Sequence, residues 1–463
     1  MAEQTKVTTL EKVVIRFSGD SGDGMQLTGT IFSNLSAIFG NEISTFPDYP
    51  AEVRAPQGTL SGVSGFQVHL GSRKIFTPGD KADVLVAMNP AALKVNVKHI
   101  KPNAIVIIDT DSFKKSDLDK ALFTTDDPFK ELGLNSVQVV AAPISTMVKD
   151  GLAEFGLDNK SALRSKNMFA LGLVCWLFDR PLEEAMHMLQ NKFAKKPVIA
   201  QANIKALTDG YNYGHNIHAS VSTYRIESKK AEPGFYTDVN GNKATSYGLI
   251  AAAEKAGLQL FLGSYPITPA TDILHELSKR KDLGVITVQA EDEIAGICTA
   301  IGGSFAGCLA ATSTSGPGLA LKSEAIGLAV IAELPLVIID VQRGGPSTGM
   351  PTKSEQTDLM QALYGRNGES PLVVVAASTP TDCFDAAYWA GKLAVEHMTP
   401  VILMTDAFIA NGSSAWKLPD LENYPEIKPN YVSNYHEEKP WKAYRRDKES
   451  LVRYWAVPGM EGF

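Results

Sequence analysis

The chain has few cysteines, and their spacing argues against the usual metal-cluster motifs. Its four cysteines, Cys175, Cys298, Cys308 and Cys383, form no C-x-x-C pair. Structural zinc sites and iron–sulfur clusters are usually bound by cysteines at such short spacings, so we expect neither within this chain. A chain of 463 residues can bury a large apolar core without disulfides, and we therefore interpret the cysteines as buried thiols.

The sequence also lacks a membrane segment and an excess of positive charge. Residues 1–6 (MAEQTK) have no apolar core typical of a signal peptide, and the longest apolar stretch, residues 326–341, is interrupted by Glu333 and Pro335. The formal net charge of −7 provides no general attraction to nucleic acid. We expect a cytoplasmic protein that binds neither membranes nor nucleic acid.

A third absence concerns the fingerprint of dinucleotide-binding enzymes. The glycine-rich turn at residues 18–24 reads SGDSGDG, which has the spacing G-x-x-G-x-G instead of G-x-G-x-x-G. This spacing disfavours a nicotinamide-dependent dehydrogenase built on two Rossmann-like domains. The turn remains a weak indication of a phosphate-bearing ligand.

Short apolar strands alternate with helical patterns along the chain, which predicts an α/β fold with mainly parallel sheets. The first half has predicted strands at 12–17, 84–88, 104–109 and 137–142, a helix from the glycine-rich turn to about residue 39, and helical residues over 160–207. The second half has predicted strands at 258–262, 285–289, 308–312, 336–341, 372–376 and 401–405, and helices at 245–256, 269–280, 291–302 and to about residue 330.

Changes in composition and periodicity along the chain predict the domain organisation. We expect a first domain at residues 1–225, a linker at 226–243, a second domain at 244–415 and an irregular C-terminal arm at 416–463. The linker is polar and rich in turn residues, and the arm is proline-rich, charged and aperiodic.

Two strand-to-helix junctions in the second domain are candidates for facing walls of a pocket. Residues 263–270 (GSYPITPA) place Thr268 before Pro269, where the helical pattern begins. A threonine before a first-turn proline is an ordinary N-cap, and that interpretation is the more common one. A helix N-terminus also attracts carboxylates and phosphates, which is the functional alternative.

The second junction, residues 289–296 (QAEDEIAG), opens the next helix with Glu291, Asp292 and Glu293. Acids in a first turn are favourable through the helix dipole alone. However, the helix continues with small and apolar residues on nearly every side, so we expect it to be buried. An acid at the mouth of a buried helix is more often functional than one on a solvated helix.

Two loops that follow strands complete the candidate constellation. Ser315 and Gly316 lie in a turn that either lets a ligand approach the backbone or is a plain tight turn. Arg343 lies beyond the carboxyl end of a strand, where ligands of parallel sheets bind and where arginine can hold a carboxylate. Thr348 and Lys353 follow in the same loop, and a surface ion pair is the ordinary interpretation of Lys353.

Taken together, these segments resemble the 2-oxoacid:ferredoxin oxidoreductases in the form that fuses the gamma and alpha parts. Residues 12–200 resemble the gamma domain through 18–24 and 46–54 (FPDYPAEVR), and residues 240–412 resemble the pyrimidine-binding domain of the alpha part. The alpha motifs are YPITP at 265–269, TSGPG at 314–318 and QRGGPSTG at 342–349. Within the family, the chain is most similar to the alpha subunit of 2-oxoglutarate:ferredoxin oxidoreductase.

The resemblance implies a reaction. A 2-oxoacid is decarboxylated on thiamine diphosphate, the acyl group passes to coenzyme A, and electrons pass through iron–sulfur clusters to ferredoxin. With 2-oxoglutarate the products are succinyl-CoA and carbon dioxide, and the reverse reaction would serve a reductive TCA cycle. Pyruvate, branched-chain 2-oxoacids and aryl pyruvates stay open as substrates, and a non-catalytic assembly subunit stays open as another class.

The resemblance also assigns the catalytic acid. The family's glutamate bonds the pyrimidine N1′ of the cofactor, and thiamine enzymes tend to place a glycine nine residues after it. That position is Gly302 when counted from Glu293 but Ala300 when counted from Glu291, so we choose Glu293.

The remaining site residues are carried over in the same way. Thr268 and Arg343 would hold the 2-oxo group and its carboxylate, and Tyr265 would line the pocket. Thr348 and Lys353 would contact the far end of a longer substrate, because an extra cation suits a dicarboxylate better than pyruvate. Ser315 and Gly316 would contact the cofactor.

Two departures from the family predict partners. The paired asparagines of a magnesium–diphosphate motif do not follow Gly24. We therefore expect Mg2+, the diphosphate and a [4Fe-4S] cluster on a beta subunit of an α2β2 assembly, and no metal site in this chain. The family's alpha part also continues into a further domain. This chain is therefore either a fragment, or that domain is a separate polypeptide. In either case we expect this chain alone not to catalyse the reaction.

Overall fold

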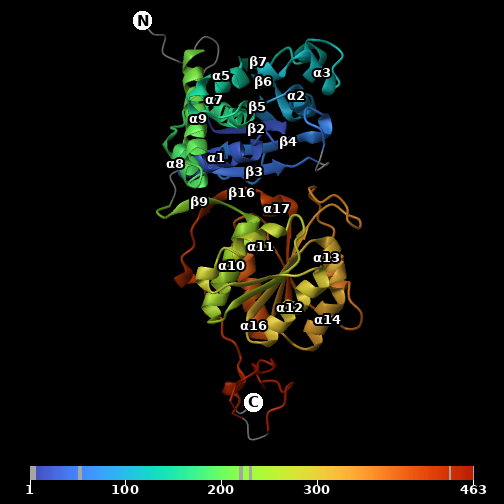
Figure 1. Ribbon diagram of the computed structural model, residues 1–463. Coiled ribbons are helices and arrows are strands. Elements are labelled where there is room, and N and C mark those ends of the chain that lie inside the picture. The colour runs from blue at the N-terminus through green and yellow to red at the C-terminus, as the bar shows by residue number, and fades with distance from the viewer. Residues whose placement is uncertain (1–6, 51–54, 218–222, 229–231, 437–439, 462–463) are drawn as a thin grey trace. The chain divides into compact units, whose positions relative to one another are not determined.

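A computed structural model describes residues 7–50, 55–217, 223–228, 232–436 and 440–461. Residues 51–54 of the motif at 46–54, residues 229–231 of the predicted linker and parts of both ends of the chain lie outside this description. The chain divides into two compact units, Met1–Asp238 with Ala415–Lys417, and Val239–Ser414 with Leu418–Phe463. Each unit is described on its own below (Figure 1).

The first unit is built on a mixed eight-stranded sheet with the order β7-β6-β5-β2-β4-β3-β16-β9. Its strands are β2 (Lys12–Asp20), β3 (Glu42–Asp48), β4 (Val63–Gly71), β5 (Ala82–Ala87), β6 (Ile100–Asp109), β7 (Gln138–Ala142), β9 (Tyr236–Asn240) and β16 (Ser413–Lys417). Strands β2, β5, β6 and β7 are parallel, whereas β4 is antiparallel to both β2 and β3. A separate parallel pair joins β1 (Val7–Leu10) to β8 (Thr223–Ile226).

Both faces of this sheet are covered, because alternate residues of β2 enter different cores. Ile15 and Phe17 pack in one core with Phe32 of α1, whereas Val14 packs in another with Leu93 of α2. The helices are α1 (Met25–Ile38), α2 (Pro90–Asn96), α3 (Lys115–Lys120), α4 (Pro128–Glu131), α5 (Ile144–Gly151), α6 (Asn159–Leu163), α7 (Lys166–Leu177), α8 (Glu183–Lys192) and α9 (Pro197–Asn216).

The second unit is built on an all-parallel six-stranded sheet with the order β11-β10-β12-β13-β15-β14. Its strands are β10 (Leu260–Ser264), β11 (Ile286–Gln289), β12 (Leu309–Thr314), β13 (Leu336–Gln342), β14 (Val373–Ala376) and β15 (Pro400–Asp406). The predicted α/β class with mainly parallel sheets is confirmed.

Helices α12 (Glu293–Phe305), α13 (Gly316–Leu321) and α14 (Ser323–Ile331) pack on this sheet and share a core with β12, β13 and β15. Helices α10 (Gly241–Ala256) and α16 (Asp382–His397) pack against each other, and the short helices are α11 (Thr271–Leu277), α15 (Leu359–Tyr364) and α17 (Ala407–Asn411). Because all six strands run the same way, their carboxyl ends share one edge, where α/β sheets bind ligands.

Three local expectations differ from the structure. The segment at 226–243 contains β9 and the start of α10, because the Asn240 side chain accepts a hydrogen bond from the Lys243 N–H at 2.9 Å and caps that helix. The helix predicted from Pro269 begins at Thr271 instead, so Thr268 is not its N-cap. Residues 268–270 form a turn, closed by the Thr271 N–H donating to Ile267 O at 3.0 Å.

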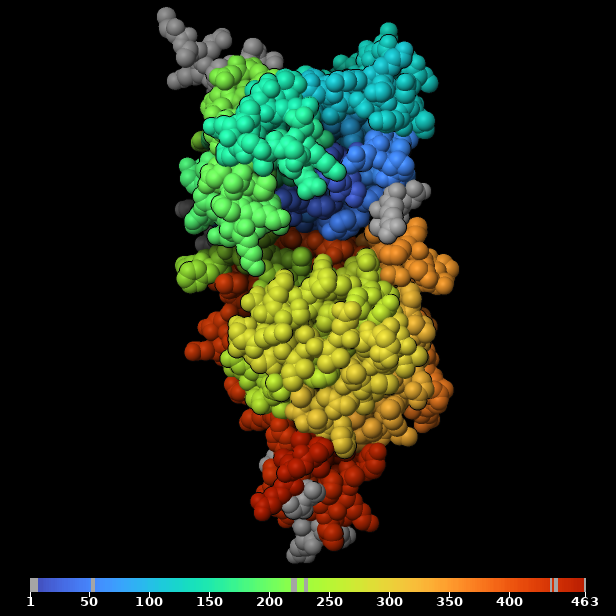
Figure 2. Space-filling view, viewed as in Figure 1, coloured from blue at the N-terminus to red at the C-terminus, as the bar shows by residue number. Residues whose placement is uncertain are grey.

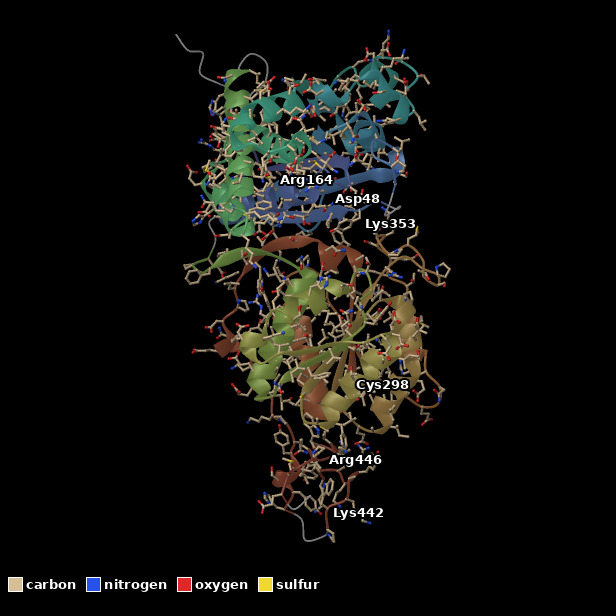
Figure 3. All side chains as sticks on the ribbon, viewed as in Figure 1. Asp48, Arg164, Cys298, Lys353, Lys442 and Arg446 are labelled. Carbon is tan, nitrogen blue, oxygen red and sulfur yellow. The ribbon has the colours of Figure 1, made fainter. Side chains whose placement is uncertain are left out.

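The expected burial of α12 and of all the cysteines is also corrected. One stripe of α12 is exposed and apolar: Ile294 is 48% exposed, Phe305 is 56% exposed, and Cys298 lies between them. Figure 3 labels Cys298 on this helix. Cys175 and Cys383 are buried, as expected, and burial raises the pKa of each thiol to about 12.

Beyond Lys417 the described chain is largely irregular and is held by aromatic contacts within the second unit. The ring centroids of Tyr424 and of Tyr388 in α16 lie 4.8 Å apart. The ring of Tyr431 stacks on that of the fully buried Trp455, with their centroids 5.8 Å apart. Among the helices of the described residues, none combines the length and the apolar composition that crossing a bilayer requires.

Candidate functional site

The two junctions predicted to form facing walls lie side by side at the carboxyl edge of the second unit's sheet. Strands β10 and β11 are parallel neighbours that pair Ser264 with Gln289, and the Ala290 N–H donates to Ser264 O at 2.9 Å. On the other side of β10, the Ser264 hydroxyl donates to Ser313 O in β12 at 2.8 Å. The loops after β10, β11 and β12 therefore converge.

Of the three neighbouring acids, only Glu293 is buried. Glu293 is the first residue of α12 and is 8% exposed, whereas Glu291 and Asp292 are exposed. Asp292 is the N-cap, because its Oδ1 accepts a hydrogen bond from the Ala295 N–H at 2.7 Å. The local sequence does not separate these roles, since all three acids suit a first turn.

A glycine in the next loop makes room for the Glu293 side chain. A Cβ atom at Gly318 would lie 2.8 Å from Glu293 Cγ and would also overlap the Thr314 hydroxyl. Any larger residue at 318 would push Glu293 out of its place. Close packing therefore explains why the TSGPG turn has a glycine at position 318.

Two buried cations interact with Glu293. The Lys322 ammonium is fully buried and donates to the Glu293 backbone carbonyl at 2.7 Å. Burial lowers the pKa of Lys322 to about 8, with the Glu293 carboxylate acting in the opposite direction. Burial likewise lowers the pKa of Arg343, again opposed by Glu293. A negative charge at Glu293 is thus compensated inside the protein.

Arg343 joins two of the predicted substrate loops through their backbones. Its Nη1 donates to Thr268 O at 2.7 Å and its Nη2 donates to Thr348 O at 2.9 Å. Its Nε is buried and has no hydrogen-bond partner among the described residues. The structure therefore brings Thr268, Arg343 and Thr348 together, with the two threonine residues exposed.

The other predicted residues surround this group less closely. Tyr265 is exposed on the loop after β10, and Lys353 is half-buried and closes the loop after β13, because Gly344 N–H donates to Lys353 O at 2.8 Å. Figure 3 labels Lys353 on that loop. The Ser315 hydroxyl is fully buried and lacks a partner within the described part of the chain.

Gly316 lies against an acid that the sequence analysis missed. A Cβ atom at Gly316 would lie 2.6 Å from the Asp358 carboxylate, so that carboxylate covers one side of the turn. The backbone of Asp358 is held in turn by its N–H donating to Gln342 Oε1 at 3.0 Å.

Asp340 in β13 was also missed. It is fully buried, and neither of its side-chain oxygens has a donor among the described residues. Burial and the adjacent Asp358 raise the pKa of Asp340 well above its ordinary value. A second acid close by makes it costly for both carboxyl groups to be ionised, which favours the protonated form of Asp340. The available signal was an acid inside the apolar run LVIIDVQ at 336–342.

The glycine-rich turn of the first unit is occupied by its own carboxylates. Asp23 accepts a hydrogen bond from the Asp20 N–H at 3.0 Å and pairs with Lys166 at 3.0 Å, and the Gly58 N–H donates to Asp20 at 3.0 Å. Burial and the Asp23 charge raise the pKa of Asp20. Two acids lining the turn give no support to the weak phosphate indication.

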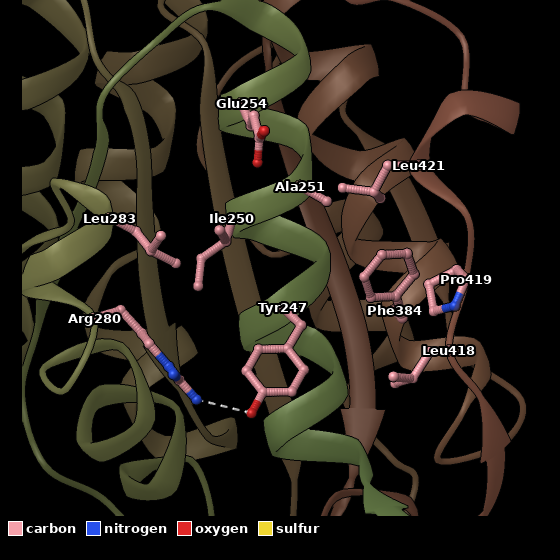
Figure 4. A pocket seen from close by; sticks show the side chains of 10 residues that line it. All are labelled: Tyr247, Ile250, Ala251, Glu254, Arg280, Leu283, Phe384, Leu418, Pro419 and Leu421. Carbon is pink, nitrogen blue, oxygen red and sulfur yellow. Dashed lines mark hydrogen bonds between the residues drawn. The ribbon is translucent and has the colours of Figure 1, made fainter. Parts of the chain in front are cut away.

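A separate pocket of about 400 Å3 lies on the outer side of α10 (Figure 4). Tyr247, Ile250 and Phe384 contribute apolar walls, and Arg280 donates to the Tyr247 hydroxyl at 3.0 Å. Arg280 and Leu283 precede β11, so the pocket lies toward the amino ends of the strands. It is not part of the constellation around Glu293.

Two family models match the chain. The model described as "Pyruvate ferredoxin/flavodoxin oxidoreductase" matches residues 14–213, and the thiamine diphosphate-binding model of pyruvate flavodoxin/ferredoxin oxidoreductases matches residues 251–458.

Curated relatives and a solved structure extend the likeness over nearly the whole chain. The 2-oxoglutarate oxidoreductase subunit KorA of Mycobacterium tuberculosis is 52% identical over 453 residues, which cover 98% of this chain and 69% of that one. The 2-oxoglutarate synthase subunit KorA of Archaeoglobus fulgidus is 40% identical over 42% of this chain and 56% of its own length.

The solved structure is 2-oxoglutarate:ferredoxin oxidoreductase from Magnetococcus marinus with 2-oxoglutarate, coenzyme A and succinyl-CoA bound. It matches with a TM-score of 0.80 and 32% identity, over 98% of this chain and 73% of that chain.

Proposed function

The chain belongs to the 2-oxoacid:ferredoxin oxidoreductase family, and from this premise we propose that it contributes the pyrimidine half of a thiamine diphosphate site. The reaction is the coenzyme A-dependent decarboxylation of 2-oxoglutarate to succinyl-CoA and carbon dioxide, with electrons passed to ferredoxin. The observation that carries this proposal is the 52% identity to a 2-oxoglutarate oxidoreductase subunit over 98% of the chain. The reductive direction and the cytoplasmic location stay predictions.

Glu293 is the residue that we propose to act on the cofactor. Bound thiamine diphosphate would supply the nucleophilic carbon that allows the carboxylate of the 2-oxoacid to leave as carbon dioxide. The chain fits such a group: Glu293 is buried at the carboxyl edge of the sheet, and the orphaned Ser315 hydroxyl is buried in the adjoining loop. Glu293 holds the proton at the pyrimidine N1′ and exchanges it there, which is general acid–base work.

Arg343 and its loops are proposed to hold the substrate. The guanidinium fixes the carbonyls of Thr268 and Thr348, so the YPITP loop and the loop after β13 become two sides of one enclosure. The unpartnered Arg343 Nε is the donor left for a carboxylate oxygen. Tyr265 lines this enclosure, and Thr348 and Lys353 provide the contacts for a second carboxylate.

A beta subunit is the proposed partner that completes the site. The exposed apolar stripe of α12 begins at Ile294, directly after Glu293, and α14 adds exposed Leu328 and Ile331 beside it. The helices α12 and α14 are both visible on the viewer's face of the second unit (Figures 1 and 2). Exposed apolar patches of this kind mark protein interfaces. A beta subunit seated there would bring the diphosphate contacts, Mg2+ and a [4Fe-4S] cluster, in an α2β2 assembly.

The proposal is tested with the assembled complex. The chain is purified together with its beta subunit, and reduction of ferredoxin or a viologen dye is followed with coenzyme A and each 2-oxoacid. We expect turnover with 2-oxoglutarate at a kcat/KM at least roughly tenfold above that with pyruvate, because a dicarboxylate engages one more cation. Equal values would overturn the substrate assignment. An intact complex that loads thiamine diphosphate but turns over none of the acids would favour the assembly-subunit alternative.

A further inference from the structure

We infer that Lys322 is a positioning residue for Glu293: its buried ammonium fixes the first turn of α12 and supplies the positive charge that a buried Glu293 carboxylate requires. This inference rests on the proposed function, because it concerns the acid assigned there. Lys322 lies outside the motifs that the sequence analysis singled out, and the proposed mechanism gives it no role.

The geometry around Lys322 is unusual for a lysine. It is 0% exposed and is among the largest fully buried side chains of the described residues. Its Nζ donates to the backbone carbonyl of Glu293 at 2.7 Å, and no other acceptor is recorded for it within the described ranges. Lysine is rarely buried completely, because its charge is costly to remove from water.

A purely structural role leaves the charge unexplained. Leucine or methionine would fill a similar volume in this apolar helix without the desolvation cost. The carbonyl that Lys322 contacts belongs to the first turn of α12, whose carbonyl groups already have intrahelical partners. What only lysine or arginine provides at this position is a positive charge beside Glu293.

Residues one helical turn apart, Gly318 and Lys322, contact the side chain and the backbone of Glu293. Gly318 and Lys322 are four residues apart, and the Lys322 N–H donates to Gly318 O at 3.0 Å. Residues at this spacing lie on the same face of a helix. Gly318 leaves the space that Glu293 Cγ occupies, and Lys322 holds the carbonyl of the same residue. The segment is therefore built around Glu293 at two points.

The charged neighbours define what the ammonium can do. Glu293 and Cys298 of α12 and the N-cap residue Asp292 are the titratable groups that act on Lys322, and Arg343 interacts with Glu293 from the end of β13. Asp292 is exposed and serves as the helix cap, so its interaction with Lys322 is screened by solvent. Glu293 is the buried anion of the group. An opposite charge beside a carboxylate favours its ionised form, and Lys322→Met removes that charge from the neighbourhood of Glu293.

The test uses the complete complex with the beta subunit and four variants: Lys322→Met, Lys322→Arg, Glu293→Gln, and the double variant that combines Lys322→Met with Glu293→Gln. Two readouts are taken between pH 5.5 and 9: the thiamine diphosphate dissociation constant by calorimetry, and the rate of 2-oxoglutarate oxidation. For Lys322→Met we expect the pH midpoint of cofactor binding and of turnover to rise by about one unit, which is roughly tenfold at a fixed pH on the acid side. Lys322→Arg should keep the midpoint of the unchanged protein.

The outcomes separate this inference from the proposed function. In the Glu293→Gln background, Lys322→Met should no longer alter the pH dependence of cofactor binding. If Glu293→Gln itself leaves binding and turnover unchanged, the proposed function fails. If Glu293→Gln abolishes turnover but Lys322→Met leaves every midpoint in place, the inference fails.

Thermal unfolding shows whether each variant is folded under the conditions of the assays. Removing one charge of a buried pair leaves the other uncompensated, so the melting temperature of Lys322→Met should fall, and the fall should be smaller in the Glu293→Gln background. A fall in melting temperature with an unshifted pH profile would mean that Lys322 is merely structural and would overturn the inference.

Discussion

Single residues at the carboxyl edge of the second unit are distinguished by burial and by charged neighbours. Glu291, Asp292 and Glu293 are three adjacent acids, yet one is free in solvent, one caps a helix and one is enclosed beside two cations. An acid enclosed in this way is shielded from water and lies among charged groups, which is more typical of a functional acid than of a solvated one.

The first prediction compares two of these acids. Glu293→Gln should lower kcat of the complex by at least roughly 100-fold, because the amide cannot exchange the proton at the pyrimidine. Glu291→Gln is the matched control and should keep near-normal activity, because Glu291 is exposed. Steady-state kinetics with 2-oxoglutarate provide the measurement. Loss of activity in the control instead would transfer the role to Glu291.

The second prediction concerns the pH dependence of stability. A raised pKa means that folded Asp340 stays protonated where the unfolded chain has released its proton. Stability is therefore lost as the pH rises above the ordinary value of 3.8 and toward the folded pKa. Asp340→Asn removes this loss, because its amide can donate to Asp358 and needs no proton.

We expect the gain in unfolding free energy of Asp340→Asn over the unchanged protein to be larger at pH 8 than at pH 5. Urea unfolding of the isolated chain at both pH values measures it. Asp282→Asn at an exposed position is the control and should show no such trend. An identical difference at both pH values would contradict the raised pKa of Asp340.

At the scale of elements, α12 has two faces with different duties. Its buried face carries Glu293, Ile297 and Ala300, and its exposed face carries Ile294, Cys298 and Phe305. Apolar character on both faces predicted a helix surrounded by its own chain. A helix that meets its own sheet on one side and another protein on the other has the same composition, so composition could not separate the two.

The third prediction follows from the exposed face. Phe305→Glu should weaken association with the beta subunit by roughly thirtyfold, about 2 kcal/mol, because a charge would be buried at the interface. The isolated chain should keep its stability within about 0.5 kcal/mol, since the residue is exposed there. Leu283→Glu, at a residue of similar exposure that lines the pocket in Figure 4, is the control. Sedimentation analysis of the mixed subunits measures the association. Unaltered assembly of Phe305→Glu would show that α12 is not part of the interface.

The fourth prediction concerns the helix pair α7 and α9 in the first unit. These helices cross at glycines, because a Cβ at Gly210 would overlap the Phe169 carbonyl and one at Gly172 would overlap the Leu207 carbonyl. Gly210→Val should destabilise the chain by about 3 kcal/mol, the upper end for overpacking. Gly327→Ala is the control, since a Cβ atom at Gly327 would have no neighbouring atom within 4 Å, and it should cost nothing. Denaturant unfolding measures the stability of both variants. A Gly210→Val variant as stable as the unchanged protein would contradict the close crossing of α7 and α9.

At the scale of the whole molecule, the proposed site is divided between this chain and a beta subunit. The described residues around Glu293 hold a carboxylate and two cations, but the magnesium–diphosphate motif is not found in the sequence. The fifth prediction is that the isolated chain reduces no acceptor with 2-oxoglutarate, coenzyme A and thiamine diphosphate, and that adding the beta subunit restores turnover. Activity of the chain on its own would contradict the division of the site between subunits.

Much of the fold and part of the site followed from the order of residues alone. The alternation of short apolar runs with helical patterns determined the α/β class, because strands buried on both faces leave that signature locally. The motifs at 265–269, 314–318 and 342–349 determined the family, because several rare segments in one order seldom coincide. Glu293 was chosen by the glycine nine residues later, although nothing in the structure packs closely against Gly302.

The tertiary structure decided what depends on contact between distant segments. Strand β4 pairs antiparallel with both β2 and β3, and it buries Gln67 and His69, so no local apolar run revealed it. Lys322 and Asp340 became significant only once folding had removed them from water. Burial is a property of all the segments that pack around a side chain, whereas a sequence pattern reports only its neighbours along the chain. For this reason the sequence predicted the chemistry that we propose for the site, and the fold decided which charges lie near Glu293.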